Sequence, residues 1–208
     1  AIALFSAAPA MAEPQSLQVN LEVDYIGFGL GSIRLLATTN GASYSADARV
    51  EPSDLTELFD AAEITANVQG IFGYGALAPV EYASENRKPE KTQLVAIKYD
   101  GDRPTSVWSD PPYRIGRHAP TDEQKVGTLD PLSGVVAMAF GTSADDDNPC
   151  GTSLPIFDGR RRYDFRLAYI RDVTIDDGDH GYRGHAIECE ASYHRVAGFN
   201  PNKPRDSE

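Results

Sequence analysis

Apolar and polar residues alternate with a period of two along most of this chain. In the first such segment the apolar positions Leu17, Val19, Leu21, Val23 and Tyr25 are separated by polar residues. Alternation of this kind predicts β-strands with one face against a core and the other in solvent. The same pattern predicts further strands near residues 32–39, 44–50, 64–75, 79–87, 92–99, 105–109, 154–157, 161–170 and 185–193. Short turn signals such as Asn40-Gly41 separate them, so we expect an antiparallel sheet of roughly nine to eleven strands.

One long apolar segment, Gly127–Phe140, has a helical pattern instead. Asp130 suits an N-cap, and Pro131 suits the first helical position because its missing N–H would be unpaired there. Met138 and Phe140 make the segment apolar nearly all round, which predicts a buried helix. The apolar stripe at helical spacing consists of Leu132, Val135, Val136 and Ala139, and with Phe140 these are the candidate core or ligand-facing residues.

These patterns together predict a mainly β protein. We expect a single strongly curved antiparallel sheet or open barrel, wrapped around one central helix at about residues 131–140. Ser53 is a plausible N-cap for a second, short helix near residues 53–62. The chain length predicts one β-rich domain over residues 13–200, followed by a flexible tail at 201–208.

Residues 1–12 carry no charge and end in Ala10-Met11-Ala12, with the small residues that signal peptidase accepts. We interpret them as the remnant of a signal peptide, cleaved near Ala12-Glu13. No other stretch approaches the roughly 18 consecutive apolar residues of a transmembrane helix. We therefore expect the mature protein to be soluble and exported.

Charge narrows the set of partners. The formal net charge is −12, which argues against nucleic acid and against an anionic membrane surface as the main partner. The sequence contains no nucleophile elbow, Walker loop or His-Glu-x-x-His motif, so we expect a non-catalytic protein without a metal or cofactor. Asp145, Asp146 and Asp147 lack the spacing of a calcium loop and are interpreted as a solvated charge run.

Two further features are candidates for chemistry. The two cysteines, Cys150 and Cys189, favour a disulfide in an exported chain, and the alternatives are a free thiol pair or a metal site. Arg160, Arg161 and Arg162 follow the Asp158-Gly159 turn. They are candidate contacts for a carboxylate or phosphate, and pairing with nearby acidic residues is the alternative.

Several segments together resemble the exported bacterial family of domain of unknown function 3108, in its alphaproteobacterial form. The strongest matches are Gly127-Thr-Leu-Asp-Pro-Leu-Ser133 and Leu154-Pro-Ile-Phe-Asp-Gly-Arg-Arg-Arg-Tyr-Asp164, with Cys150 before the second motif and Cys189 in Glu-Cys-Glu-Ala-Ser-Tyr193. The resemblance implies a periplasmic protein and, by looser analogy, a curved open barrel like the lipoprotein-carrier fold. It supplies no catalytic residues.

We therefore expect a periplasmic protein that binds an apolar ligand, such as a lipid acyl chain, in its curved sheet and serves envelope maintenance. The alternative is a structural or interaction module of an envelope protein complex that binds no small molecule. An enzyme is the third hypothesis, and it requires His118 or His185 to meet acidic residues in a cleft.

Overall fold

The computed structural model describes residues 14–25, 28–53, 62–73, 76–114, 116–139, 150–176 and 183–200. Ten strands and two short helices lie in these residues, which confirms a mainly β protein. Seven strands form one antiparallel sheet in sequence order: β1 (Gln15–Tyr25), β2 (Phe28–Thr39), β3 (Ser43–Pro52), β4 (Glu63–Gly73), β5 (Ala76–Lys88), β6 (Lys91–Asp100) and β7 (Arg103–Asp110). A second sheet has the order β10-β9-β8 and consists of β8 (Ser153–Phe157), β9 (Arg162–Asp176) and β10 (Arg183–Ala197).

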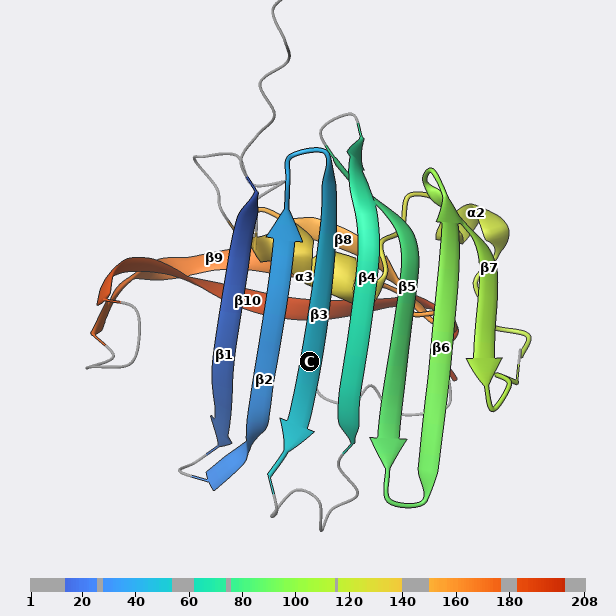
Figure 1. Ribbon diagram of the computed structural model, residues 1–208, viewed down its shortest axis with the longest axis horizontal. Helices are drawn as coiled ribbons and strands as arrows, with labels where there is room; N and C mark the ends of the chain where they lie inside the picture. Colours follow the sequence, from blue (N-terminus) through green and yellow to red (C-terminus); the bar gives the residue numbers. More distant parts are fainter. Residues whose placement is uncertain are drawn as a thin grey trace, which may run out of the picture.

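The two faces of the seven-stranded sheet differ in burial, as the alternation predicts. On β2, Leu35 is 7% exposed while its neighbour Leu36 is 45% exposed. We call the face that carries Leu35 the inner face. Across the upper half of the sheet as drawn in Figure 1, this face holds most of the core. Its buried side chains include Ala37, Tyr44, Ala46, Val68, Tyr82, Val95 and Ile97.

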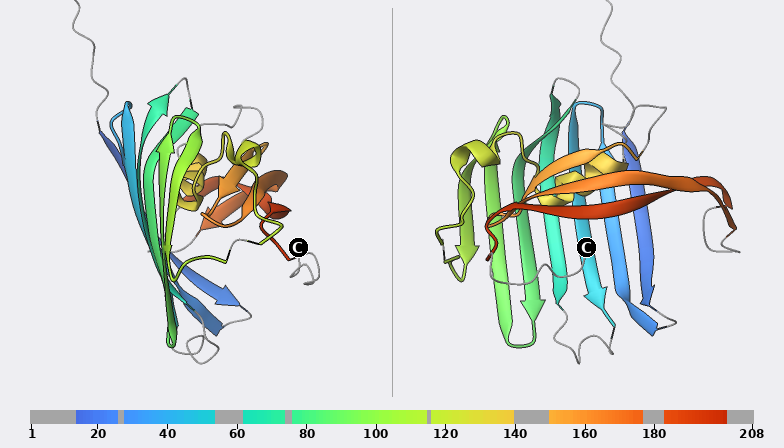
Figure 2. Two further views of the ribbon diagram at one scale, coloured as in Figure 1. Left: turned by 90° about the vertical axis from the view of Figure 1, so that its right-hand side faces the viewer. Right: turned by 180° about the vertical axis from the view of Figure 1, so that it is seen from behind.

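The helix α3 (Pro131–Ala139) and the three-stranded sheet form a second layer over the upper half of the inner face (Figure 2). Leu132, Val136 and Ala137 of α3 are at most 4% exposed, and the helix contacts β3, β4, β5 and β8. Two small residues on the sheet, Ala37 and Ala46, are fully buried below this layer. Short side chains at such positions let a second layer pack closely.

The three-stranded sheet is dominated by the long β9–β10 hairpin. Its two strands pair over almost their full lengths, with a register shift between Glu188 and Cys189. The hairpin runs across the sheet from near β6 and continues past β1, the edge strand at the left of Figure 1. We call the half of the hairpin nearer its turn, residues 169–176 and 183–189, the arm.

The structure corrects two expectations. The described residues form two sheets and neither closes into a barrel, so the prediction of a single sheet is wrong. The helix α3 lies in a second layer over one face of the seven-stranded sheet, so a sheet wrapped around a central helix is not borne out. The long connection that contains α3 leads from β7 to β8 in a separate sheet, whose strands run across those of the first (Figure 2). Period-two alternation does not reveal this change of sheet. A short helix α2 (Asp122–Lys125), which the apolar pattern does not predict, lies between β7 and α3. Thr121 and Gln124 form a capping box at its start. The helix expected near 53–62 falls mainly on residues 54–61, outside the described residues.

Candidate functional site

The lower half of the inner face carries a row of aliphatic side chains. Strand register places Leu21 opposite Ile33, Ile33 opposite Val50, and Val50 opposite Ile64. Because side chains alternate along a strand, all four share the face of Leu35 and Ala48. We call these four residues the apolar row. The next positions in the same register are polar: Ile64 lies opposite Asn86 on β5, and Asn86 lies opposite Gln93 on β6. The apolar row therefore ends at β4.

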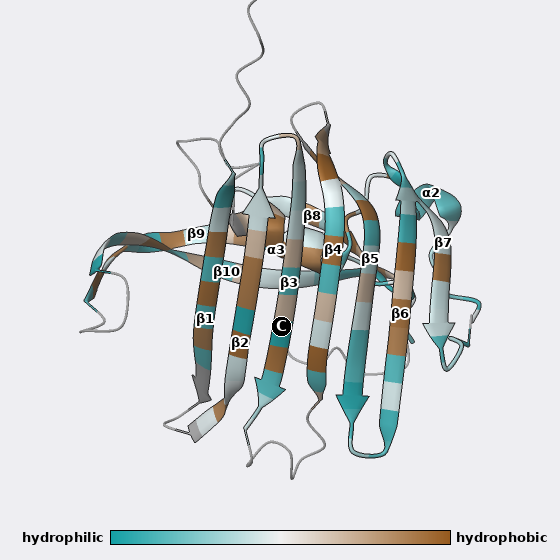
Figure 3. Ribbon diagram, viewed as in Figure 1, coloured by the Kyte–Doolittle hydropathy of each residue, from teal (hydrophilic) through white to brown (hydrophobic). Residues whose placement is uncertain are grey.

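No described element packs over this part of the sheet. Viewed from behind in Figure 2, α3 and the three-stranded sheet cross only the upper half. Leu21 is 51% exposed, and the other three members of the apolar row are half-buried. Apolar segments of β1 to β4 lie level with one another below the covered region in Figure 3. Contiguous exposed apolar surface of this kind is typical of binding surfaces.

A buried polar network lies at the start of α3. The carboxylate of Asp130 accepts hydrogen bonds from the backbone N–H groups of Leu132 and Ser133, at 3.0 and 2.9 Å, and from the Ser133 hydroxyl. The Tyr44 hydroxyl lies 2.8 Å from Ser133 Oγ. Since Ser133 donates its single proton to the carboxylate, Tyr44 donates to Ser133. Asp130 is thus the N-cap that the sequence predicts, with a further link to strand β3.

Burial determines the protonation chemistry of this network. Desolvation raises the pKa of Asp130 to about 6, although its hydrogen bonds act in the opposite direction. Desolvation also raises the pKa values of Tyr44, Tyr82 and Tyr99. Asp130 and Ser133 are fully buried, so no substrate reaches them in this conformation. We assign the network a structural role.

The two sequence motifs that most resemble the family contact each other. Leu129, in the first motif, forms a parallel β-bridge with Ile156 in the second. The backbone N–H of Leu129 donates to Pro155 and that of Phe157 donates to Leu129, at 2.9 and 2.8 Å. On α3, a Cβ at Gly134 would meet Ile156 at 2.7 Å. The motifs therefore attach α3 and its approach to strand β8.

The helix residues predicted to face the core or a ligand lie in different environments. Leu132 and Val136 lie in the core between α3 and the sheet. Val135 is 37% exposed, so α3 is not buried all round. The side chain of Ala139 and the whole of Phe140 lie outside the described residues. The surface left open on the sheet is instead the apolar row.

Arg160, Arg161 and Arg162 separate into two environments. Arg162 is held inside the fold: its Nη1 lies 2.6 Å from Asp164 and its Nε donates to the Gln124 carbonyl. Arg160 and Arg161 are exposed, and each lies over an aromatic ring. The rings are those of Tyr113 and Phe199.

Cys150 and Cys189 form a disulfide with a Cα–Cα distance of 5.8 Å. The bond links Cys150, three positions before the start of β8, to the middle of β10. Cys150 is fully buried. The disulfide that the cysteine count favours is confirmed, and the free-thiol and metal-site alternatives are excluded.

The structure does not bring the histidines of the enzyme hypothesis together. His185 lies 3.0 Å from Asp172 on the exposed arm, and the Tyr169 hydroxyl donates to the same carboxylate. His118 is exposed near the other end of the hairpin, where its carbonyl accepts from the Gly198 N–H. Among the described residues, no group of three or more histidine, cysteine or acidic side chains is arranged to hold a metal ion.

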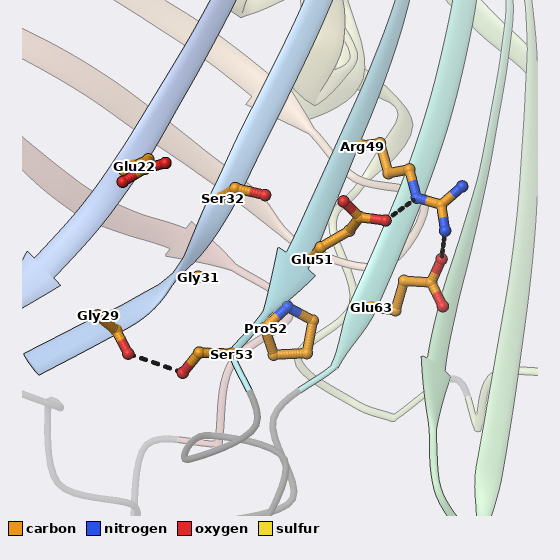
Figure 4. A pocket seen from close by; sticks show the side chains of 9 residues that line it. All are labelled: Glu22, Gly29, Gly31, Ser32, Arg49, Glu51, Pro52, Ser53 and Glu63. Carbon is orange, nitrogen blue, oxygen red and sulfur yellow. Dashed lines mark hydrogen bonds and ion pairs between the residues drawn. The ribbon is translucent and has the colours of Figure 1, made fainter.

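A polar depression of about 490 Å³ lies on the outer face, at the lower ends of β1 to β4 (Figure 4). Arg49 dominates it and bridges Glu51 and Glu63 at 2.8 and 2.7 Å. Glu22 forms the opposite wall. Since the guanidinium is already paired with two carboxylates, it is not available to an anionic ligand.

Sequence reasoning did not identify the apolar row as a site. Each member was visible as an apolar position on a predicted strand. Their alignment depends on the register between four strands, and their exposure depends on where the second layer stops.

The fold and the site define a two-layer, mainly β protein with an open apolar sheet face and one disulfide. The chain belongs to the family described as "Protein of unknown function (DUF3108)", whose model matches residues 20–194. No curated protein and no solved structure matches the chain. In the part that the structure describes, no helix has the length and apolar character needed to cross a membrane.

Proposed function

We propose that this protein is an exported, periplasmic binding protein that holds an apolar chain, such as a lipid acyl chain, against the apolar row. The observation that carries the proposal is the continuation of the apolar inner face beyond the elements that cover it. Leu21, Ile33, Val50 and Ile64 span four adjacent strands and remain partly exposed to solvent. A role in envelope maintenance follows from a lipid ligand in that compartment.

The shape of the sheet supports a bound chain. In the side view of Figure 2, the lower ends of β1 and β2 bend toward the side that carries α3. The bend coincides with a register shift between Val23 and Asp24. Bulges of this kind bend a strand and increase its twist. A ligand on the apolar row would then be flanked by the second layer above and by the bent strands at one side.

Two observations support export. A disulfide persists in oxidising compartments and is rare in the cytosol. The uncharged residues 1–12, with small residues at Ala10 and Ala12, match the end of a signal peptide. We therefore propose cleavage near Ala12-Glu13.

The test is binding of a neutral fluorescent apolar probe, N-phenyl-1-naphthylamine, to the purified protein. We compare the wild type with Val50→Asn/Ile64→Asn in the apolar row. The matched control is Leu36→Asn/Ile71→Asn, which changes two aliphatic residues that are 45% and 50% exposed on the outer face. We expect at least tenfold weaker binding for the row variant and less than a twofold change for the control. Equal effects of the two variants would contradict the proposal.

Mass spectrometry of lipids extracted from protein purified out of its native periplasm identifies the natural ligand. An acyl-chain amphiphile should be bound to the wild type and be depleted in the row variant. Repeated preparations without any bound amphiphile would count against the proposal.

A second candidate function, an interaction module of an envelope protein complex, is favoured by the arm. Tyr169, Ile170, Ile175 and Ile187 are 37–51% exposed on β9 and β10. A photo-crosslinking amino acid at Ile187 should capture one reproducible protein partner in cells if this function is correct. The same crosslinker at Leu36 is the control, and identical capture patterns would argue against a specific interface.

A further inference from the structure

Three segments that are distant in the sequence converge at the end of the β9–β10 hairpin opposite the arm. The backbone N–H of Gly198 donates to the His118 carbonyl. The Cα of Gly198 packs so closely against the backbone of Arg160 and Arg161 that a Cβ would clash there. The Asp158–Arg161 turn itself lies over β6 and β7, because a Cβ at Gly159 would contact Val95 and Val107.

This convergence gathers arginine side chains around aromatic rings. Arg161 and Arg195 both lie over the Phe199 ring, at 5.5 and 5.2 Å from its centroid. Arg160 lies 5.6 Å from the centroid of the Tyr113 ring. We call these five residues the arginine–aromatic cluster. All three distances lie within the range of cation–π attraction.

Stacking orders a guanidinium group without consuming its hydrogen-bond donors. The ring attracts the positive charge through its face, while the N–H groups point outward in the guanidinium plane. Among the described residues, no carboxylate lies within ion-pair distance of the Arg160 or Arg161 side chain. This contrasts with Arg162, which is paired with Asp164.

Asp158 is the acidic residue of this turn, and its charge interacts with Arg160 and Arg161 without a direct side-chain ion pair. One oxygen of Asp158 accepts the backbone N–H groups of Arg160 and Arg161, at 2.9 and 2.6 Å. The Asp158 carboxylate therefore holds the backbone of the turn, while the two guanidinium groups lie over the rings. Arg114 and Arg117 are exposed and lie in the connection between β7 and α2, the segment that also contains Tyr113 and His118. They add positive charge to this segment. A concentration of arginines is notable in a chain whose formal net charge is −12.

We propose that the arginine–aromatic cluster is a binding site for a phosphate group. A planar guanidinium donates two parallel hydrogen bonds to a phosphate, and pre-ordering by the rings reduces the entropy lost on binding. The phosphate is supplied either by a free phosphate or phosphomonoester or by the head group of an anionic lipid. This site goes beyond the proposed function, because it does not require an apolar ligand on the apolar row.

The experiment uses the full chain with its disulfide intact, at low ionic strength. One arm titrates inorganic phosphate by calorimetry. The other measures co-sedimentation with vesicles of phosphatidylcholine alone and of phosphatidylcholine with phosphatidylglycerol. The test variant is Arg160→Gln/Arg161→Gln, in which the turn survives because Asp158 holds backbone groups. The control is Arg34→Gln/Arg103→Gln, which removes the same charge from two exposed positions outside the cluster.

We expect the cluster variant to weaken binding at least tenfold and the control to change it less than twofold. Arg161→Lys keeps the charge but loses the bidentate geometry, so it should weaken binding several-fold. Binding of inorganic phosphate assigns a free phosphate ligand, whereas binding only to the anionic vesicles assigns a head group. Absence of binding in both arms, or equal losses in the cluster variant and the control, would overturn the proposal.

Discussion

At the scale of single residues, Asp130 connects the sequence motif to the fold. Its carboxylate caps α3 and, through Ser133, reaches the hydroxyl of Tyr44 on β3. The ring of Tyr44 in turn crosses Gly70 of β4, where a Cβ would overlap it. A residue that combines an N-cap with a buried link to the sheet fixes both the start of the helix and its position.

The raised pKa of Asp130 makes the stability of the protein depend on pH. Its folded pKa, about 6, lies above the unfolded value near 3.8, so the folded state binds the proton more tightly. The resulting stabilisation is fully present below the unfolded pKa and is lost as the pH rises through the folded pKa. Asp130→Asn removes this titration. We expect the free energy of unfolding of the wild type, relative to the Asn variant, to fall between about pH 4 and pH 7. Urea denaturation of both proteins across this pH range measures the difference in their free energies of unfolding. If the two free energies changed with pH in the same way, the raised pKa of Asp130 would be refuted.

Two buried tyrosines provide a matched comparison. The Tyr99 hydroxyl is buried and has no hydrogen-bond partner among the described residues, whereas the Tyr44 hydroxyl bonds to Ser133. Tyr99→Phe should leave stability unchanged or raise it by about 1 kcal/mol, because an unpaired buried hydroxyl carries a desolvation cost. Tyr44→Phe should destabilise by about 1 kcal/mol. Chemical denaturation compares them, and the reverse order would contradict this account.

At the scale of elements, α3 joins the two sheets. It packs Leu132 and Val136 against the inner face and is linked to β8 by the Leu129–Ile156 bridge. The helix α3 packs above small sheet residues such as Ala46 on one side and against Ile156 of β8 on another. This explains why α3 is apolar on more than one side. The same packing closes the upper half of the inner face, so the open surface lies lower, at the apolar row.

Two leucines test the contribution of α3. Leu132 is 4% exposed and Leu36 is 45% exposed. Leu132→Ala should lower the free energy of unfolding by about 2–5 kcal/mol, since it leaves a cavity between the layers. Leu36→Ala should change it by less than about 0.5 kcal/mol. Equal melting temperatures for the two variants would show that α3 contributes little to the core.

At the scale of the whole molecule, the disulfide stabilises one layer selectively. The closed loop between Cys150 and Cys189 spans 39 residues and contains β8 and β9, while the seven-stranded sheet and α3 lie outside it. In the loop-entropy model such a crosslink contributes about 4 kcal/mol. Reduction should therefore lower the melting temperature without abolishing the fold.

Thermal unfolding followed by circular dichroism, with and without reductant, measures this effect. Cys150→Ser/Cys189→Ser is the control and should be insensitive to reductant. Loss of all β signal on reduction, or an unchanged melting temperature, would contradict the separation into a disulfide-dependent layer and an independent sheet.

The sequence by itself determined the local structure. Period-two alternation predicted nearly every strand, Asp130-Pro131 predicted the start of α3, and the even cysteine count favoured the disulfide. These features succeed because side-chain direction, helix capping and thiol chemistry depend on residues that are near in sequence or on composition alone.

Only the tertiary structure decided the division into two sheets, the extent of the second layer and the location of the open surface. The apolar row exists because register aligns Leu21, Ile33, Val50 and Ile64, and because α3 and the three-stranded sheet cover only the upper half of the inner face. The three consecutive arginines look equivalent in the sequence, yet Arg162 is paired internally while Arg160 and Arg161 lie over rings from distant segments. Long-range contacts of this kind depend on how separate segments pack, and no local pattern records that packing.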